Sequence, residues 1–221
     1  MTTPQRVGPR SAGRRDRPPG FVWYAAYGSN THLVRLDSYL AGGVPPGGGR
    51  EYPGCRDARP PLRSVPLELP GRMYFATHSP VWSGGRAFYD GDAPGGGVRA
   101  RAHLLTVGQF SDIVAQEMYR TPGADLDLAE VLRHGRARLG DGRYETLLYP
   151  GDVDGHPVLV FTAPWGSGGA EHVRPSGIYL RHIAEGLAEA GAWDLPGIAA
   201  YLAECADGAW DPREITALLG R

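Results

Sequence analysis

The stretch from Phe21 to Asn30 reads FVWYAAYGSN. Seven apolar or aromatic residues run without a break into a Gly-Ser-Asn turn. After the turn, Leu33, Leu36 and Leu40 recur at the spacing of an amphipathic helix. An unbroken apolar run of this length predicts a strand buried on both faces. The stretch therefore predicts a buried strand, a tight turn and the beginning of a helix.

The turn has the features of a small anion-binding site. Gly28 allows a strained backbone and a close approach to a ligand, and Ser29 or Asn30 can cap the helix that follows. The free N–H groups at a helix start favour a carboxylate or a phosphate. From the local pattern alone, however, an ordinary strand-to-helix connection that binds nothing is the simpler interpretation.

Composition excludes several classes of chemistry. The chain has 221 residues, enough for one sizeable domain, and a net charge of −1. All 23 basic residues are arginine, which excludes Schiff-base lysines, pyridoxal phosphate attachment and a P-loop lysine. The near-neutral charge gives no indication of a nucleic-acid or membrane partner. The richness in Arg, Gly, Ala and Pro is typical of a high-GC bacterial genome.

Cysteine and histidine give no sign of a metal centre. Cys55 and Cys205 are isolated, and the seven histidines include no i, i+4 pair. Isolated cysteines indicate a reducing compartment, and no apolar run is long enough to span a membrane. We therefore expect a cytoplasmic protein with no metal site.

The sequence predicts one domain with two irregular segments. Residues 1–20 are rich in Arg, Pro and Gly and predict a disordered tail. Residues 21–221 predict a single domain, within which residues 41–71 form a Pro- and Gly-dense insertion. A loop of that length is either a wall of an active site or a partly mobile segment.

Beyond the insertion, strands and helices alternate. Strands are predicted over residues 72–77, 85–89, 98–105, 143–149 and 156–162, and helices over residues 125–134, from Ile178 to Leu187, around Ile198 to Leu202 and from Pro212 to Leu219.

Glu117 is the most unexpected residue of the sequence. Residues 106–109 have capping-box spacing and begin a helix in which Phe110, Ile113, Val114 and Glu117 share one face. A carboxylate therefore lies on an apolar stripe. From the pattern alone, a carboxylate at a helix end that reaches solvent or pairs with an arginine is the simpler interpretation.

Three features together resemble the γ-glutamylcyclotransferase family. The first is Tyr27-Gly28-Ser29-Asn30 behind an apolar strand, with Arg35 downstream. The second is Glu117, in a helix after the central strands. The third is the pattern of residues 175–191, which includes Tyr179. They occur in the family's order and cover residues 21–205.

The resemblance implies an α+β fold, with a mixed β-barrel-like sheet flanked by helices and a pocket at the barrel mouth. It also implies cofactor-free cleavage of a small-molecule γ-glutamyl amide, whose glutamyl part cyclises to 5-oxoproline and releases an amine. By the same resemblance Glu117 is the catalytic base, and Tyr27, Gly28, Ser29, Asn30 and Tyr179 bind substrate. A core role for each tyrosine fits the sequence nearly as well.

Because of two departures from the family pattern, the identity of the amine that is released stays open. Met118 and Tyr119 follow the glutamate where the family has a small residue, and the insertion at 41–71 is long. An amino acid, glutathione or a γ-glutamyl-protected amine all fit. Two other functions also fit: an acyl or aminoacyl amide hydrolase using the same pocket, and a non-catalytic module that binds a small molecule or a protein. The latter predicts that Glu117 pairs with an arginine or faces away from the turn.

Overall fold

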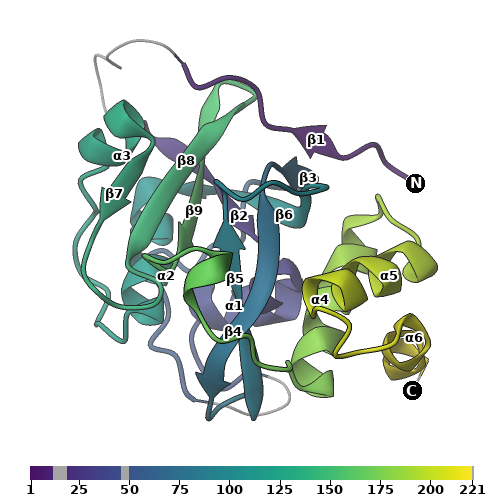
Figure 1. Cartoon of the computed structure of the whole chain (residues 1–221). Coiled ribbons are helices and arrows are strands. Elements are labelled where there is room, and N and C mark those ends of the chain that lie inside the picture. The colour runs from purple at the N-terminus through teal and green to yellow at the C-terminus, as the bar shows by residue number, and fades with distance from the viewer. Residues whose placement is uncertain (12–18, 46–49, 221) are drawn as a thin grey trace.

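A computed structural model of the chain describes residues 1–11, 19–45 and 50–220 (Figure 1). Its main feature is a mixed sheet of seven strands in the order β1-β3-β6-β2-β9-β8-β7. In that order the strands are β1 (Gln5–Arg6), β3 (Arg63–Leu69), β6 (Val98–Thr106), β2 (Phe21–Ala26), β9 (His156–Thr162), β8 (Thr146–Val153) and β7 (Arg136–Arg138). β2 runs antiparallel to β6 and parallel to β9.

The predicted strand is β2, and its two faces serve two separate cores. Trp23 and Ala25 belong to one hydrophobic cluster, whereas Val22, Tyr24 and Ala26 belong to the other. All five are buried. The continuous apolar run is thus explained by a central strand with a core on each side.

Helices cover both faces of the sheet. On the side of Tyr24 lie α1 (Leu33–Leu40), α2 (Val107–Glu117) and α3 (Ala129–His134). On the side of Trp23 lie α4 (Gly177–Ala190), α5 (Leu195–Cys205) and α6 (Pro212–Leu219), which group together in Figure 1. The predicted capping box of α2 is present, with Thr106 accepting from the backbone N–H of Gln109.

β4 (Arg72–Ser79) and β5 (Gly84–Asp90) form an antiparallel hairpin beside the seven-stranded sheet. Phe75 and Tyr89 join the core cluster of Trp23. In β9, the hydroxyl of Thr162 donates to the Tyr89 carbonyl at 2.7 Å and accepts from its N–H at 3.0 Å. The α+β fold with a mixed, barrel-like sheet flanked by helices is therefore as expected.

The segment 1–20 differs from the expectation of a disordered tail. Gln5 and Arg6 form β1, which pairs in parallel with β3, and Gly8 donates to the Asp152 carbonyl at 2.9 Å. The open edge of β3 explains the difference, because its free backbone groups take a further strand whatever its side chains are. Residues 12–18 lie outside the described residues.

The segment 41–71 also contains more structure than expected, because its last part is β3. Pro66 lies inside this strand opposite Arg101 of β6. Proline has no N–H to donate, which argues against a position inside a strand. Pro66 is tolerated because β1 pairs only with Leu67 and Glu68, so no hydrogen bond to β1 requires an N–H at Pro66. Residues 46–49 lie outside the described residues.

The helix after the turn begins later than predicted. A short 3₁₀ turn, η1 (Ser29–Thr31), comes first, and α1 then starts at Leu33 with His32 at its N-cap. Neither Ser29 nor Asn30 caps α1. Instead the Thr31 hydroxyl donates to the Gly28 carbonyl at 2.8 Å and closes the turn. A second 3₁₀ turn, η2 (Ser167–Gly169), precedes α4.

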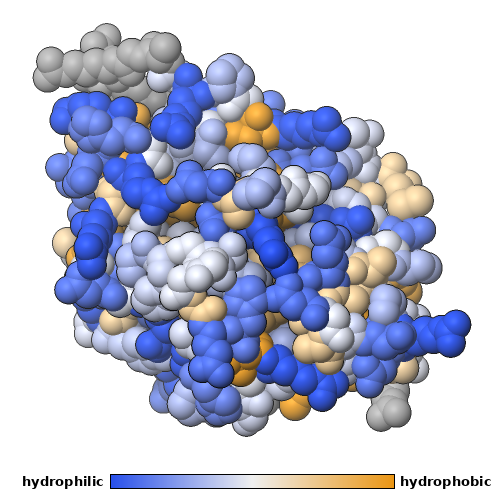
Figure 2. All heavy atoms as spheres, viewed as in Figure 1, coloured by the Kyte–Doolittle hydropathy of each residue, from blue (hydrophilic) through white to orange (hydrophobic). Residues whose placement is uncertain are grey.

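No helix of the described residues is both long and apolar enough to cross a bilayer. On the face drawn in Figure 2, hydrophilic residues dominate and the apolar ones are scattered.

Gly186 permits the close packing of α4 on the turn, which leads to a first prediction. A Cβ atom there would lie 2.3 Å from the backbone N of His32. We expect Gly186→Ala to destabilise the fold by about 1–3 kcal/mol, because this overlap outweighs the gain of roughly 1 kcal/mol from alanine in a helix. Gly168→Ala is the control, since nothing lies within 4 Å of its Cβ position. Equal unfolding free energies for the two variants in urea would contradict the prediction.

Candidate active site

Glu117 and the turn after β2 line the same hollow. Two cavities adjoin: the one lined by Arg35 and Tyr39, of about 70 Å³, is named the outer cavity, and the one lined by Tyr27 and Gly28, of about 40 Å³, is named the inner cavity. Both are lined by Ser29, Glu117, Tyr144 and Tyr179. Tyr27, Gly28 and Asn30 line the inner cavity. The structure thus brings together all six residues that the sequence singled out.

The carboxylate of Glu117 is held by a tyrosine. Glu117 is the last residue of α2, and the hydroxyl of Tyr39 in α1 donates to its Oε1 at 2.5 Å. Burial raises the pKa of Glu117, while the hydrogen bond from Tyr39 and the charge of Arg35 oppose that rise. Within the described residues no arginine forms an ion pair with Glu117. The side chain is therefore a partly dehydrated acid that faces a cavity.

A chain of hydrogen bonds continues from Tyr39 to a buried arginine. The Tyr39 hydroxyl lies 3.1 Å from that of Tyr52, which accepts from Arg35 Nη2 at 3.2 Å. Tyr52 belongs to the 41–71 segment, and Tyr39 lies on the buried face of α1. Neither tyrosine was predicted from the sequence as a residue of the site. Tyr39, three residues after Leu36, carried the helical periodicity that could have found it.

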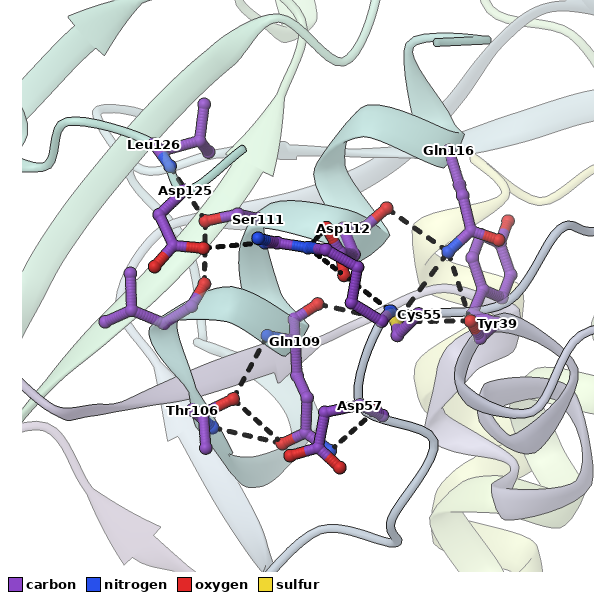
Figure 3. Close-up of polar contacts among 12 residues, drawn as sticks. Tyr39, Cys55, Asp57, Thr106, Gln109, Ser111, Asp112, Gln116, Asp125 and Leu126 are labelled. Carbon is purple, nitrogen blue, oxygen red and sulfur yellow. Dashed lines mark hydrogen bonds and ion pairs between the residues drawn. The ribbon is translucent and has the colours of Figure 1, made fainter. Parts of the chain in front are cut away.

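A second network fixes the end of α2 against α1 (Figure 3). Asp112 accepts from the backbone N of Arg56 at 2.8 Å and from its Nε at 3.0 Å. Gln116 Nε2 donates to the Tyr39 carbonyl at 3.0 Å. These bonds connect α2 to the insertion and to α1, so they set where Glu117 meets Tyr39.

Gly28 is needed for space rather than for backbone strain. Its φ of −97° is negative, so the turn does not use the left-handed backbone conformation that glycine allows. A Cβ at this position would, however, lie 3.1 Å from the Tyr179 hydroxyl. The Thr31 N–H donates to the Gly28 carbonyl at 3.1 Å, so within η1 the N–H groups of Ser29 and Asn30, both residues of the cavity wall, are the ones that can serve a ligand.

The tyrosines of the wall are neutral and ordered. The Tyr179 hydroxyl accepts from the Ala87 N–H at 3.2 Å, and burial raises the pKa of Tyr179 to about 12. Tyr144 donates to the Ala87 carbonyl at 3.0 Å. The Tyr27 hydroxyl already donates to the Phe161 carbonyl at 3.0 Å. Tyr27 can therefore shape the cavity, whereas the Tyr179 hydroxyl keeps its proton for a ligand.

One cluster of side chains has the composition of a metal site. His32, His182 and Glu185 place one ligand atom each within 4.8 Å of one another. Glu185 is already bonded to Arg181 Nε at 2.7 Å, and His32 Nε2 lies 3.1 Å from Glu189. No spacing in the sequence predicts this cluster, because His32 directly follows η1 whereas His182 and Glu185 lie on α4.

A larger cavity of about 490 Å³ lies between residues 94–99 and α5. Cys205 is in its wall, but burial raises the pKa of this thiol to about 12 and leaves it a poor nucleophile. Its wall contains Glu68 and Glu204 but none of the six residues that the sequence singled out.

Comparisons with known proteins give weak similarities. No family model matches the chain. A stretch of 102 residues is 34% identical to histone deacetylase 5 of Arabidopsis thaliana and covers 43% of this chain. The chain spans only 15% of the length of that relative.

Two solved structures are similar in fold. An uncharacterized human protein, LOC79017, aligns with a TM-score of 0.47 and 15% identity over 78% of this chain and 82% of that one. A gamma-glutamyl cyclotransferase aligns with a TM-score of 0.46 and 15% identity over 77% and 80%. Similarity at this level assigns no activity, so the chemistry must be argued from the residues of the cavity.

The raised pKa of Glu117 predicts an effect on stability. Because its folded-state pKa lies above the unfolded one, the protonated acid favours folding at low pH, and that contribution is lost as pH rises through the folded-state pKa. Each unit of difference amounts to about 1.4 kcal/mol. Glu117→Gln should therefore unfold at a higher temperature than the parent near neutral pH, with the gain shrinking toward about pH 4. Glu171→Gln, at an exposed loop position, should show no such trend. A pH-independent difference between parent and Glu117→Gln would contradict the inference.

Proposed function

We propose that the chain is an enzyme that cleaves a γ-glutamyl amide by intramolecular cyclisation. The free α-amino group of the glutamyl unit attacks its own γ-carbonyl, the amide C–N bond breaks, and 5-oxoproline and an amine leave. One observation carries this proposal: a carboxylate that has no ion pair among the described residues faces the cavity that the start of η1 also lines.

Glu117 has the properties that this reaction asks of a base. The α-ammonium group must lose a proton before it can attack, and an acid with a raised pKa takes that proton more readily than an exposed one. The same proton is then available to the departing amine. Tyr39 orients the carboxylate through its hydrogen bond and leaves the second oxygen for the substrate.

The turn supplies groups that stabilise negative charge on the substrate. Backbone N–H groups at the start of η1 suit either the α-carboxylate of the glutamyl unit or the oxyanion that develops on its γ-carbonyl. Because nucleophile and carbonyl belong to one molecule, a cavity that holds the glutamyl chain folded removes much of the entropic barrier. This mechanism needs no lysine.

Two other functions make different demands on the same residues. A non-catalytic binding module predicts Glu117 paired with an arginine or turned away, whereas Glu117 is bonded to Tyr39 and faces the cavity. That geometry favours catalysis. An amide hydrolase would use Glu117 to activate water, and its product would be a free acid such as glutamate instead of 5-oxoproline.

Incubation with a panel of γ-glutamyl amides, including glutathione, tests the proposal by detection of 5-oxoproline. We expect Glu117→Gln to lose about 10²–10⁴-fold in kcat, because a positioned general base contributes that much. Glu171→Gln should turn over like the parent. A Glu117→Gln variant as active as the parent would remove this residue from the mechanism, and glutamate as the sole product would favour the hydrolase.

Tyr39 should set the pH dependence. Protonated Glu117 is no base, so kcat/KM should rise with pH through the raised pKa of Glu117. The Tyr39 hydrogen bond lowers that pKa, so Tyr39→Phe should raise it further and move the acidic limb of the pH profile to higher pH. Tyr149→Phe, whose hydroxyl bonds to Asp152 outside the cavity, is the matched control. An acidic limb that moves to lower pH or stays in place in Tyr39→Phe would contradict the assignment.

A further inference from the structure

Four guanidinium groups line the outer cavity, and they outnumber its carboxylates. Arg35, Arg50, Arg86 and Arg143 come from α1, from the 41–71 segment, from β5 and from the loop before β8. Glu117 is the acidic residue of the same wall. Four positive charges against one negative charge leave this cavity strongly positive in a chain of net charge −1.

Among the described residues, these four arginines have only neutral hydrogen-bond acceptors. The bonds are Arg35 to the Tyr52 hydroxyl at 3.2 Å, Arg86 to the Thr77 hydroxyl at 3.0 Å, Arg143 to the Tyr119 hydroxyl at 2.9 Å, and Arg50 to the Gln116 carbonyl. Many arginines elsewhere in the described chain pair with carboxylates, as Arg120 does with Glu145 and Arg101 with Glu189. Arg99 and Arg174 instead lie against aromatic rings. What sets the cavity apart is that four guanidinium groups gather in its wall around a single carboxylate.

Placing these groups together has an electrostatic cost. Burial lowers the pKa of Arg86, and the like charge of Arg143 lowers it further. Arg35 is 2% exposed, and its Nε has no hydrogen-bond partner among the described residues. A buried guanidinium without a counter-charge is unfavourable, and a bound anion removes that cost.

Tyr119 fixes two of the arginines at the cavity. The guanidinium of Arg50 lies 4.3 Å from the centre of the Tyr119 ring and that of Arg143 lies 5.2 Å from it. Tyr119 has a φ of 58°, a left-handed conformation that is uncommon for a residue other than glycine. This conformation, two residues after Glu117, turns the ring toward both cations. Tyr119, one of the two residues that depart from the family pattern, therefore organises the positive wall, which consists of Arg35, Arg50, Arg86 and Arg143.

The inner and outer cavities suit different parts of a substrate. The turn lines the inner cavity with Glu117, so the glutamyl unit belongs there under the proposed function. All four arginines line the outer cavity alone. Arg35 is the arginine of the Glu117 hydrogen-bond chain, and its charge acts on Glu117, which lines both cavities. From the outer cavity it therefore suits the α-carboxylate of a glutamyl unit held beside Glu117. Arg50, Arg86 and Arg143 then face what is attached to the γ-carbonyl.

We infer that the amine released by this enzyme carries at least two negative charges, held by Arg50, Arg86 and Arg143. The inference rests on the proposed function and specifies its substrate. The chemical class is an amine bearing two carboxylates or a phosphate, such as an acidic amino acid in γ-glutamyl linkage. Guanidinium groups bind both kinds of oxyanion through paired N–H donors.

A pair of substrates matched in size provides the test. γ-Glutamyl-glutamate and γ-glutamyl-glutamine differ by one negative charge, and we expect kcat/KM to favour the first by about tenfold or more, mainly through KM. The preference should shrink in high salt, which screens a partly exposed charge. γ-Glutamyl-phosphoserine against γ-glutamyl-serine shows whether phosphate serves as well as a second carboxylate.

Substitutions test whether the arginines of the outer cavity cause the preference for the more acidic substrate. Arg86→Gln and Arg143→Gln should lose it, with KM for γ-glutamyl-glutamate rising more than KM for γ-glutamyl-glutamine. Arg143→Lys keeps the charge and should retain most of it. Arg213→Gln, at an exposed position of α6, is the control. Equal kcat/KM for the matched pair, or a preference that survives both glutamine variants, overturns the inference.

A binding measurement separates this inference from the proposed function. Inorganic pyrophosphate should raise the melting temperature of the parent and of Arg213→Gln, but not that of the Arg86→Gln/Arg143→Gln double variant. If 5-oxoproline forms without any charge preference, the proposed function stands and the inference falls. If no substrate yields 5-oxoproline but pyrophosphate binds as described, the cyclisation falls and the anion site stands. Equal pyrophosphate shifts in parent and double variant overturn the anion site.

Discussion

The hydrogen bond of 2.5 Å from Tyr39 to Glu117 is the contact on which the site depends. It joins α1 to the end of α2 and satisfies a carboxylate that burial would otherwise penalise. Its geometry is set from outside the cavity, by Gln116 bonded to the Tyr39 carbonyl and by buried Asp112 bonded to Arg56. The acid is thereby held by a hydroxyl instead of by a cation, and it remains able to accept a proton.

Strand pairing explains why the acid and the turn meet. Phe21, the first residue of β2, pairs with Thr106, the last of β6, so α2 begins level with the start of β2. The eleven residues of α2 span about 16 Å, and the six of β2 about 20 Å. Phe110 packs on Tyr24, so α2 runs back along β2 and ends near the turn that follows it. Two local lengths thus produce one long-range contact.

The difference between local patterns and long-range contacts also decides what the sequence could predict. β2, the capping box of α2 and the Glu117 stripe are local patterns, and the structure contains each of them. β1 and β3 were missed because pairing at a sheet edge depends on partners, and Pro66 argued against a strand. The four arginines and Tyr52 were missed as a set because they come from separate elements, and no spacing in the sequence relates them.

The positive wall also bears on how the proposed reaction ends. Before cleavage, the outgoing nitrogen is an uncharged amide, so an acidic leaving group meets the arginines with its full negative charge. After cleavage the amine takes up a proton at neutral pH and becomes an ammonium group within the same cavity. That new charge repels the guanidinium groups and lowers the net charge by which they hold the product. Arginines that bind an anionic amide tightly would therefore bind the released amine less tightly, which favours turnover over product retention.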